Sequence, residues 1–168
     1  MRSFLFVPGD SARKFEKAVG GDADALILDL EDSVAASAKA AARGTVGDML
    51  RGDRGGKAMF VRVNALDTGL TLADLAAVLP HAPDGICLPK CEGPDDLNRV
   101  ANYLAAFEAA HGLSPVKIIA MPIPTITRKD QNTMATGGCS SSGIVSRPSI
   151  GASHSCLRMK LESLGMPI

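Results

Sequence analysis

Short apolar runs alternate with longer mixed segments along the first two thirds of this chain. The apolar runs are four to six residues long and are bounded by Gly, Pro or Asp, a pattern typical of buried strands. They predict strands at Phe4–Val7, Ala25–Asp29, Ala58–Val63, Gly85–Leu88 and Val116–Met121. The segments between them are rich in Ala, Leu and charged residues at helical spacing and predict helices at Ser11–Val19, Ala35–Leu50, Leu72–Leu79 and Pro94–His111.

This alternation predicts an α/β fold in which a parallel sheet is covered by helices. Five strands and four helices fit an open doubly wound sheet, and they equally fit just over half of a (β/α)8 TIM barrel. Periodicity alone does not decide between the two. No G-x-G-x-x-G motif follows the first strand, which argues against a dinucleotide-binding fold.

The alternation stops after Met121. Pro122 and Pro124 interrupt the last strand, and the apolar periodicity of a core element is missing from the residues that follow. We therefore divide the chain into an α/β part, residues 1–121, and an atypical, irregular tail, residues 122–168. A truncated or frame-shifted reading frame explains such a tail more simply than an unusual natural variant, so we expect it to be frame-shifted or disordered.

Composition narrows the possible functions. The formal net charge of the 168 residues is zero, and with one Tyr and no Trp there are few platforms for stacking bases, so we expect no nucleic-acid partner. No apolar run approaches the roughly 20 residues that span a bilayer, and the N-terminus is typical of a strand rather than a signal peptide. The four cysteines are too sparse for a disulfide scaffold. These features predict a soluble, cytoplasmic protein with reduced thiols and no membrane partner.

Three acids, Asp29, Glu31 and Asp32, stand within four positions where the second predicted strand ends. Side chains alternate along a strand, so Asp29 and Glu31 share one face, while Asp32 belongs to the following turn. Clustered acids repel one another unless a cation, an arginine or hydrogen-bond donors compensate, which makes this position a candidate site. The alternative, which is compatible with a site, is that Asp32 or Ser33 caps the next helix and Glu31 is solvated.

Four segments in order resemble one known family. They are Arg2-Ser3-Phe4-Leu5-Phe6-Val7-Pro8-Gly9, Leu28-Asp29-Leu30-Glu31-Asp32-Ser33-Val34, Val61-Arg62-Val63-Asn64 and Leu88-Pro89-Lys90. Together they are similar to the strands of the HpcH/HpaI aldolase and citrate lyase beta-subunit family, over residues 1–121. The resemblance implies a (β/α)8 barrel and a carbon-carbon lyase that acts on a citryl, malyl or citramalyl thioester of coenzyme A, or on an oxo acid, through a Mg2+-stabilised enolate.

The resemblance also implies roles for individual residues. The arginine that matches Arg62 binds the substrate carboxylate or thioester carbonyl in the family, and Asp29, Glu31 and Asp32 match acids that support the magnesium site. The residues themselves leave a second interpretation of Arg62 open, because a guanidinium within an apolar strand needs a partner and Asp29 or Glu31 offers one. The two interpretations are compatible.

Four further residues are candidates for contacting coenzyme A. Arg13 and Lys17 lie four apart on the first predicted helix, where they share a face and could meet a phosphate or be merely solvated. Phe6 could pack against the thioester arm or in the core. Lys90 resembles a lysine of the family's fourth strand, and a solvated charge at the rim fits equally well.

The family's two magnesium ligands have no match here. They are a glutamate after the fifth strand, in a T-E-T-P-like turn, and an aspartate after the sixth, in a G-x-E-D-L-like turn. In this chain Pro122-Ile123-Pro124-Thr125 follows the fifth strand, and Asp130 is the first acid after it. The metal ligands are therefore unknown, and we expect either a lyase of the family type or a catalytically inactive fragment or thioester-binding protein. An incomplete barrel also predicts a homo-oligomer or aggregation.

Overall fold

The structure, a computed structural model, describes residues 1–122. Residues 123–168, nearly all of the expected tail, lie outside the described part. The strands are β1 (Phe4–Pro8), β2 (Ala25–Asp29), β3 (Ala58–Arg62), β4 (Gly85–Cys91) and β5 (Lys117–Pro122). The α-helices are α1 (Ala12–Val19), α2 (Lys39–Arg51), α3 (Thr71–Val78) and α4 (Pro94–His111), and the short 3-10 helices are η1 (Ala36–Ala38), η2 (Leu66–Thr68) and η3 (Leu79–His81).

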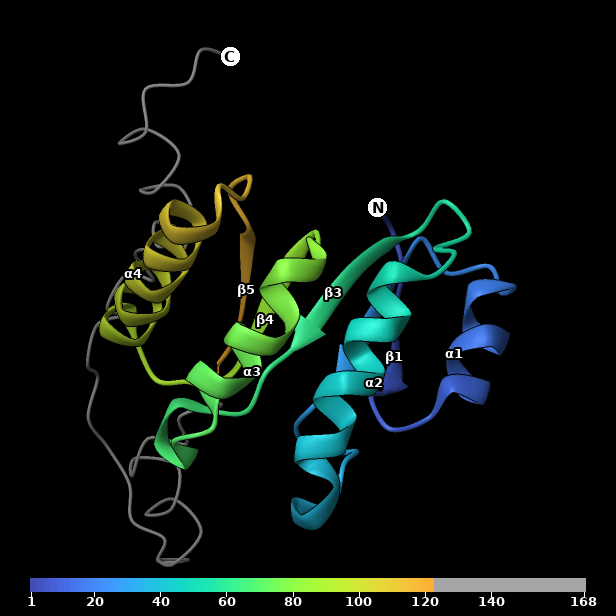
Figure 1. The fold of residues 1–168 in the computed structure, drawn as a ribbon, viewed down its shortest axis with the longest axis horizontal. Coiled ribbons are helices and arrows are strands. Elements are labelled where there is room, and N and C mark those ends of the chain that lie inside the picture. The colour runs from blue at the N-terminus through green and yellow to red at the C-terminus, as the bar shows by residue number, and fades with distance from the viewer. Residues whose placement is uncertain (123–168) are drawn as a thin grey trace, which may run out of the picture. The chain divides into compact units, whose positions relative to one another are not determined.

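The strands form one parallel sheet in the order β1-β2-β3-β4-β5, so each strand pairs with the next one in the chain (Figure 1). A doubly wound sheet starts at an inner strand and reverses direction, whereas a (β/α)8 barrel adds its strands consecutively. The consecutive order therefore settles the choice that the sequence left open. The described fold is part of a (β/α)8 barrel, as the resemblance implied.

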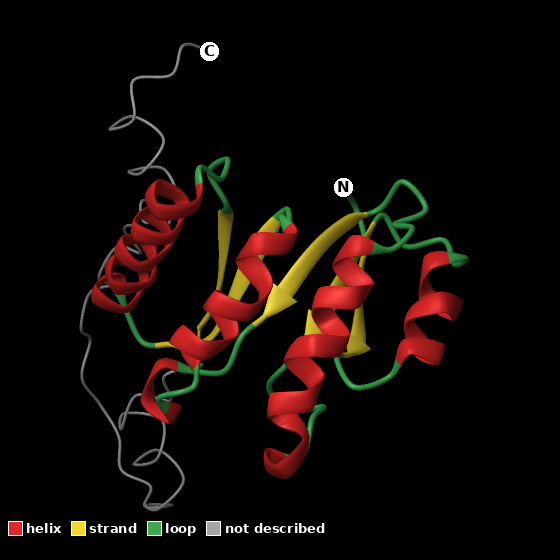
Figure 2. Cartoon of the chain, viewed as in Figure 1, coloured by secondary structure: helices red, strands yellow, loops and turns green. Residues whose placement is uncertain are grey.

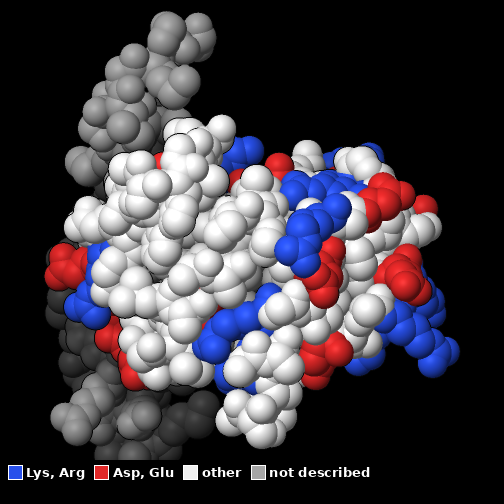
Figure 3. All heavy atoms as spheres, in the orientation of Figure 1, with Lys and Arg blue, Asp and Glu red and all other residues white. Residues whose placement is uncertain are grey.

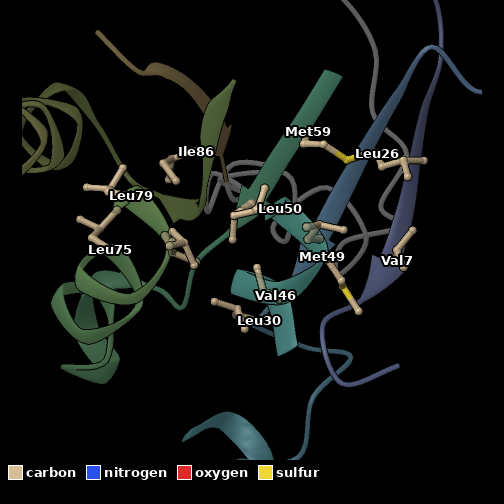
Figure 4. Close-up of a cluster of buried hydrophobic side chains, with 14 of the residues drawn as sticks. Val7, Leu26, Leu30, Val46, Met49, Leu50, Met59, Leu75, Leu79 and Ile86 are labelled. Atoms are coloured by element: carbon tan, nitrogen blue, oxygen red, sulfur yellow. The ribbon is translucent and has the colours of Figure 1, made fainter. Parts of the chain in front are cut away.

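All four α-helices cover the same face of the sheet (Figure 2). The core between them and the strands is built from fully buried aliphatic side chains, among which Leu26 and Met59 come from strands and Val46, Leu50 and Leu75 from helices (Figure 4). A second, smaller cluster lies on the opposite face of the strands. Its buried members are Ala25, Ile27, Phe60 and Cys87.

Helix α4 shows how the local sequence sets the limits of these elements. It begins with Pro94, which has no backbone N–H that would be left without an acceptor in the first turn. Asp95 and Asp96 follow in the same turn, where their negative charges interact favourably with the helix dipole. It ends at His111 and is followed by the C-cap Gly112, whose left-handed φ of 62° suits a glycine. No α-helix among the described residues combines the length and the apolar character that crossing a membrane requires.

The predicted strands and helices match the observed strands and α-helices to within one residue at each end, apart from two larger differences. The segment predicted as one helix, Ala35–Leu50, is divided into η1 and α2. Strand β4 continues three residues beyond Leu88 to Cys91, through a bulge in its pairing with β5. Both differences fall next to the C-terminal ends of the strands, where a barrel of this kind places its active site.

Gly9 couples the end of β1 to the end of β2. Its N–H donates a 2.9 Å hydrogen bond to the carbonyl oxygen of Asp29. A Cβ atom at this position would lie 2.7 Å from that oxygen and 2.8 Å from Cγ2 of Val46. Only a glycine therefore lets the Pro8-Gly9 turn approach the strand that carries the acidic run.

Candidate active site

Strand register brings the candidate residues together. In the β2–β3 pairing Asp29 lies opposite Arg62, and in the β3–β4 pairing Arg62 lies opposite Cys87. Since directly paired residues of parallel strands point to the same face, these three side chains share one side of the sheet. The C-terminal ends of β2, β3 and β4 thus form one site from segments that are far apart in the sequence.

Arg62 and Asp29 form a bidentate ion pair. The Nε and Nη2 atoms of Arg62 each donate to one oxygen of Asp29, both over 2.7 Å. The side chains are 14% and 2% exposed. Asp29 is thus the internal partner that a guanidinium within an apolar strand requires. The hydrogen bonds from Arg62 to Asp29 raise the pKa of Arg62.

Asp29 also organises the turn behind it. It accepts backbone N–H bonds from Glu31 at 2.8 Å and from Ser33 at 3.0 Å. Burial alone would raise the pKa of Asp29, but the hydrogen bonds from Arg62 and Ser33 outweigh it and lower this pKa below its ordinary value of 3.8. Asp29 is therefore a fixed carboxylate in the folded protein.

The capping interpretation of the acidic run is wrong. The N-caps of η1 and α2 are Ala35 and Ala38, and neither helix is capped by a side-chain hydrogen bond. The Ser33 amide is bound to Asp29, and the Asp32 carboxylate lies 3.5 Å from Nη1 of Arg62. These contacts draw Asp32 and Ser33 toward the strand ends and away from the helix.

Glu31 is buried, at 6% exposure, and not solvated. Its Oε2 lies 3.2 Å from Nη1 of Arg62, and its Oε1 lies 3.0 Å from Nζ of Lys90. One carboxylate therefore bridges cations from two different strands. We call Asp29, Glu31, Asp32, Arg62 and Lys90 the strand-end cluster.

Lys90 reaches this cluster because of the bulge in β4. Leu88 pairs with Ala120 and Cys91 with Pro122, so β4 has one residue more than β5 in this interval. Lys90 has a left-handed φ of 50° there. Its pKa is raised by the adjacent Glu31 carboxylate, although half of the side chain is exposed.

Phe6 and Cys87 complete the surroundings of Arg62. The guanidinium carbon lies 4.9 Å from the centre of the Phe6 ring, a cation-π geometry, and this ring is 44% exposed. Cys87 is fully buried, and burial raises the pKa of its thiol to about 11. A thiol in that state is not a nucleophile at neutral pH.

Helix α1 presents its basic residues to solvent. Arg13 and Lys17 are both exposed, and over α1 and α2 charges of both signs lie side by side (Figure 3). A cleft of about 290 Å³ between α1 and β1 includes Lys17 but not Arg13. Its lining residues are Leu5, Phe6, Val7, Pro8, Lys14, Lys17, Ala18 and Gly21.

Several residues that support the site were missed by the sequence interpretation. Lys39 donates 2.8 Å hydrogen bonds to the carbonyl oxygens of Leu30 and Glu31. Lys14 lines the cleft beside Lys17. Lys14 lies three residues before Lys17, so helical spacing could have identified it. No sequence pattern identifies Lys39, because in the sequence a lysine that binds loop carbonyl oxygens cannot be distinguished from a solvated lysine on a helix.

A second buried network, also not foreseen, fixes the end of β3. The Asp74 side chain on α3 is fully buried and accepts 2.7 Å hydrogen bonds from Nε of Arg43 and from the backbone N and Nδ2 of Asn64. Asn64 follows Arg62 by two residues. The network therefore ties α2 and α3 to the strand that carries the central arginine.

A family model described as HpcH/HpaI aldolase/citrate lyase matches residues 2–162. The chain belongs to this family. The family match extends beyond Met121, where the resemblance inferred from the sequence motifs ends.

Curated relatives agree with the family assignment. A (3S)-malyl-CoA thioesterase of Cereibacter sphaeroides is 40% identical over 129 residues, which are 72% of this chain and 45% of the relative. An L-malyl-CoA/beta-methylmalyl-CoA lyase of the same species is 39% identical over 115 residues, 66% of this chain and 36% of the relative. The chain thus spans less than half the length of these family members.

Solved structures match the described fold. A Mycobacterium tuberculosis CitE protein in complex with magnesium, acetoacetate and coenzyme A is 34% identical, with a TM-score of 0.51 over 71% of this chain and 38% of the other. A Haloferax volcanii malate synthase magnesium/glyoxylate complex has a TM-score of 0.60 at 19% identity over 71% of this chain and 41% of the other, a likeness of fold alone.

The described residues do not provide a magnesium site of the family type. Among residues 1–122 no group of three or more His, Cys, Asp or Glu side chains could hold a metal ion. The three acids of the strand-end cluster face Arg62 and Lys90 instead. The turn after β5 and Asp130, where the family's ligands are missing from the sequence, lies outside the described residues.

Proposed function

We propose that this chain is a carbon-carbon lyase of the citrate lyase beta-subunit type, acting on a coenzyme A thioester such as malyl-, citramalyl- or citryl-CoA. The observation that carries the proposal is the half-buried Arg62 at the C-terminal ends of the strands, held in a bidentate pair by Asp29. Relatives named as malyl-CoA thioesterase and malyl-CoA lyase support the substrate class.

Within this proposal Arg62 is the fixed cation toward which the substrate carboxylate or thioester carbonyl turns. A guanidinium is planar and permanently charged. The ion pairs with Asp29, Glu31 and Asp32 fix the orientation of the Arg62 guanidinium. Preorganised charge of this kind costs no rearrangement when negative charge develops on the substrate. No step of the proposal is assigned to a metal, because the described residues offer no ligand set for one.

We assign coenzyme A to the side of the site formed by β1 and α1. Phe6 is exposed beside Arg62 and offers an apolar surface to the thioester arm. Lys17 lines the adjoining cleft together with Lys14, where their ammonium groups are available to a phosphate. Arg13 on the same helix adds positive charge nearby, and Lys90 is a cation at the strand ends.

A second candidate function is thioester binding without catalysis. It is favoured by the pairing of all three strand-end acids with cations and by the lack of a metal-holding group among residues 1–122. A binding protein needs the cationic site, whereas a lyase of this family type also needs an electrophile that stabilises the enolate.

Calorimetric titration of the full chain with Mg2+ and then with acetyl-CoA separates the candidates, with far-UV circular dichroism as the check of folding. The lyase proposal expects both to bind. Thioester binding without metal binding supports the second candidate. A folded chain that binds neither contradicts both.

A malyl-CoA cleavage assay tests the role of Arg62 directly. We expect Arg62→Lys to reduce cleavage at least about tenfold, because a lysine cannot reproduce the bidentate geometry. Arg99→Lys, at an exposed position on α4, is the matched control and should leave cleavage unchanged. Equal cleavage by the Arg62→Lys variant and the control would remove Arg62 from the proposal.

A further inference from the structure

Arg62 is already occupied by partners from its own chain. Two of its nitrogens bind Asp29, the third faces Glu31 and Asp32, and the ring of Phe6 lies against the guanidinium. The side chain is only 14% exposed. An incoming oxyanion therefore meets a guanidinium whose donors are largely taken.

Lys90 is the opposite case. Half of its side chain is exposed, and among the described residues Glu31 is its one ion-pair partner. An ammonium carries three N–H donors, so a single carboxylate contact leaves donors directed to solvent. Of the two cations in the strand-end cluster, Lys90 is thus the one with capacity for a ligand.

The backbone places Lys90 there at a cost. Lys90 and Ala82 are the only residues other than glycine with a positive φ in the described part of the chain. A left-handed conformation is strained for a residue with a side chain, and such strain persists where surrounding contacts enforce it. The bulge in β4 gives the backbone this conformation at Lys90, and the ion pair with Glu31 is a contact that helps to maintain it.

Glu31 is well suited to anchor the ammonium because it is itself held on both sides. Its backbone N–H donates to Asp29 over 2.8 Å, and its carbonyl oxygen accepts a 2.8 Å bond from Lys39. Its carboxylate is buried and bridges Arg62 and Lys90. The Glu31 carboxylate therefore has a fixed position, and its ion pair with Lys90 orients the ammonium.

We propose that Glu31 is a positioning residue that holds the ammonium of Lys90 at the mouth of the site, where Lys90 binds an oxyanion of the ligand directly, while Arg62, still paired with its own carboxylates, attracts the substrate through its positive charge. This inference rests on the proposed function for the nature of the ligand. The oxyanion is the carboxylate of an oxo acid or a phosphate of coenzyme A.

Ligand binding by Lys90→Met is the first test. The full-length chain is titrated calorimetrically with acetoacetate and separately with acetyl-CoA. Loss of a charge-assisted contact predicts a roughly ten- to hundredfold weaker affinity for at least one probe. Weaker acetoacetate binding alone identifies the carboxylate as the source, and weaker acetyl-CoA binding alone identifies the phosphate. Lys117→Met, an exposed lysine at the other end of the sheet, is the matched control.

The role of Glu31 is tested on Lys90 itself, without a ligand. The rate at which an amine-reactive acetylating reagent modifies Lys90 is followed against pH by peptide mass spectrometry. Lys90 faces the carboxylates of Glu31, Asp32 and Asp67, of which Glu31 has the largest effect. Glu31→Gln should therefore move the profile to lower pH, whereas Glu92→Gln, an exposed acid two residues from Lys90, should not.

The outcomes separate this inference from the proposed function. If Lys90→Met binds both probes as the unaltered chain does, or if Glu31→Gln leaves the modification profile in place, the inference is overturned and the function stands. If the unaltered chain binds neither probe, both are overturned. Because Lys90 is half exposed, its variant tests the inference even if the Glu31→Gln variant does not fold.

Discussion

The pairing of Asp29 with Arg62 makes the stability of this chain depend on pH. The pKa of Asp29 is lowered in the folded state, so its ionisation stabilises the protein above the unfolded pKa of about 4, and this contribution is lost as the pH falls through the lower folded value. We expect Asp29→Asn to lower the free energy of unfolding by about 3–5 kcal/mol at neutral pH, because Arg62, which is 14% exposed, loses its bidentate carboxylate partner.

Urea unfolding between pH 3 and pH 7 measures this dependence. The free energy of unfolding of the unaltered chain should fall more steeply below pH 4 than that of the Asp29→Asn variant. If the free energies of unfolding of the two proteins changed in parallel with pH, the pKa of Asp29 would not be lowered in the folded state and the prediction would be wrong.

Much of this site was predictable from the sequence, because the register of paired strands determines which residues lie next to each other. Asp29 and Arg62 were both placed at strand ends, and parallel register then left them side by side. The sequence did not foretell that Glu31 is buried and bridges two cations, or that Lys90 takes a left-handed φ. Both depend on the bulge in β4, and a bulge leaves no periodic signal in a strand of seven residues.

At the scale of elements, Asp74 joins α2 and α3 to the end of β3. Replacing it with alanine leaves the half-buried Arg43 and the buried Asn64 without their acceptor, so we expect Asp74→Ala to cost about 3–5 kcal/mol of unfolding free energy. Asp67→Ala, an exposed acid in η2, should change it by less than about 0.5 kcal/mol. Equal effects in urea unfolding would contradict a structural role for the network.

Two glycines should respond in opposite directions to alanine. At Gly9 a methyl group would lie 2.7 Å from the Asp29 oxygen, so we expect Gly9→Ala to destabilise the chain by about 1–3 kcal/mol. Gly44, in the interior of α2, has nothing within 4 Å of such a methyl group, and Gly44→Ala should stabilise by about 0.5–1 kcal/mol. Thermal unfolding of both variants checks the signs, and a stabilising Gly9→Ala would disprove the close approach.

The elements themselves were predictable because hydrophobic periodicity reflects burial. All five residues of β2 are buried, as its continuous apolar run required. The division of the predicted helix Ala35–Leu50 was not foreseen, because alanines suit α-helix and 3-10 helix alike and the turn before them is set by Asp29. Tertiary contacts, rather than propensity, decide where α2 begins.

At the scale of the whole molecule, β1 is one of the two outer strands of the described sheet. Phe4, Leu5 and Phe6 follow one another on it and are 45%, 44% and 44% exposed. Exposed apolar side chains on an edge strand favour association. We therefore expect the chain to self-associate with increasing concentration, and Leu5→Lys to reduce this association.

Gel filtration with light scattering over a range of concentrations measures the effect. Leu72→Lys, which changes an equally exposed leucine on α3, is the control and should associate as the unaltered chain does. A stable monomer at every concentration would contradict the prediction.

The consecutive order of the strands also bears on how the chain folds. Each strand finds its partner across a single intervening α-helix, so the main-chain pairings of residues 1–122 are local in sequence. Low contact order speeds folding, and chains are synthesised from the N-terminus. Each new strand and helix can therefore dock on a part of the sheet that the ribosome has already released, and Asp29 of β2 meets its partner Arg62 as soon as β3 emerges.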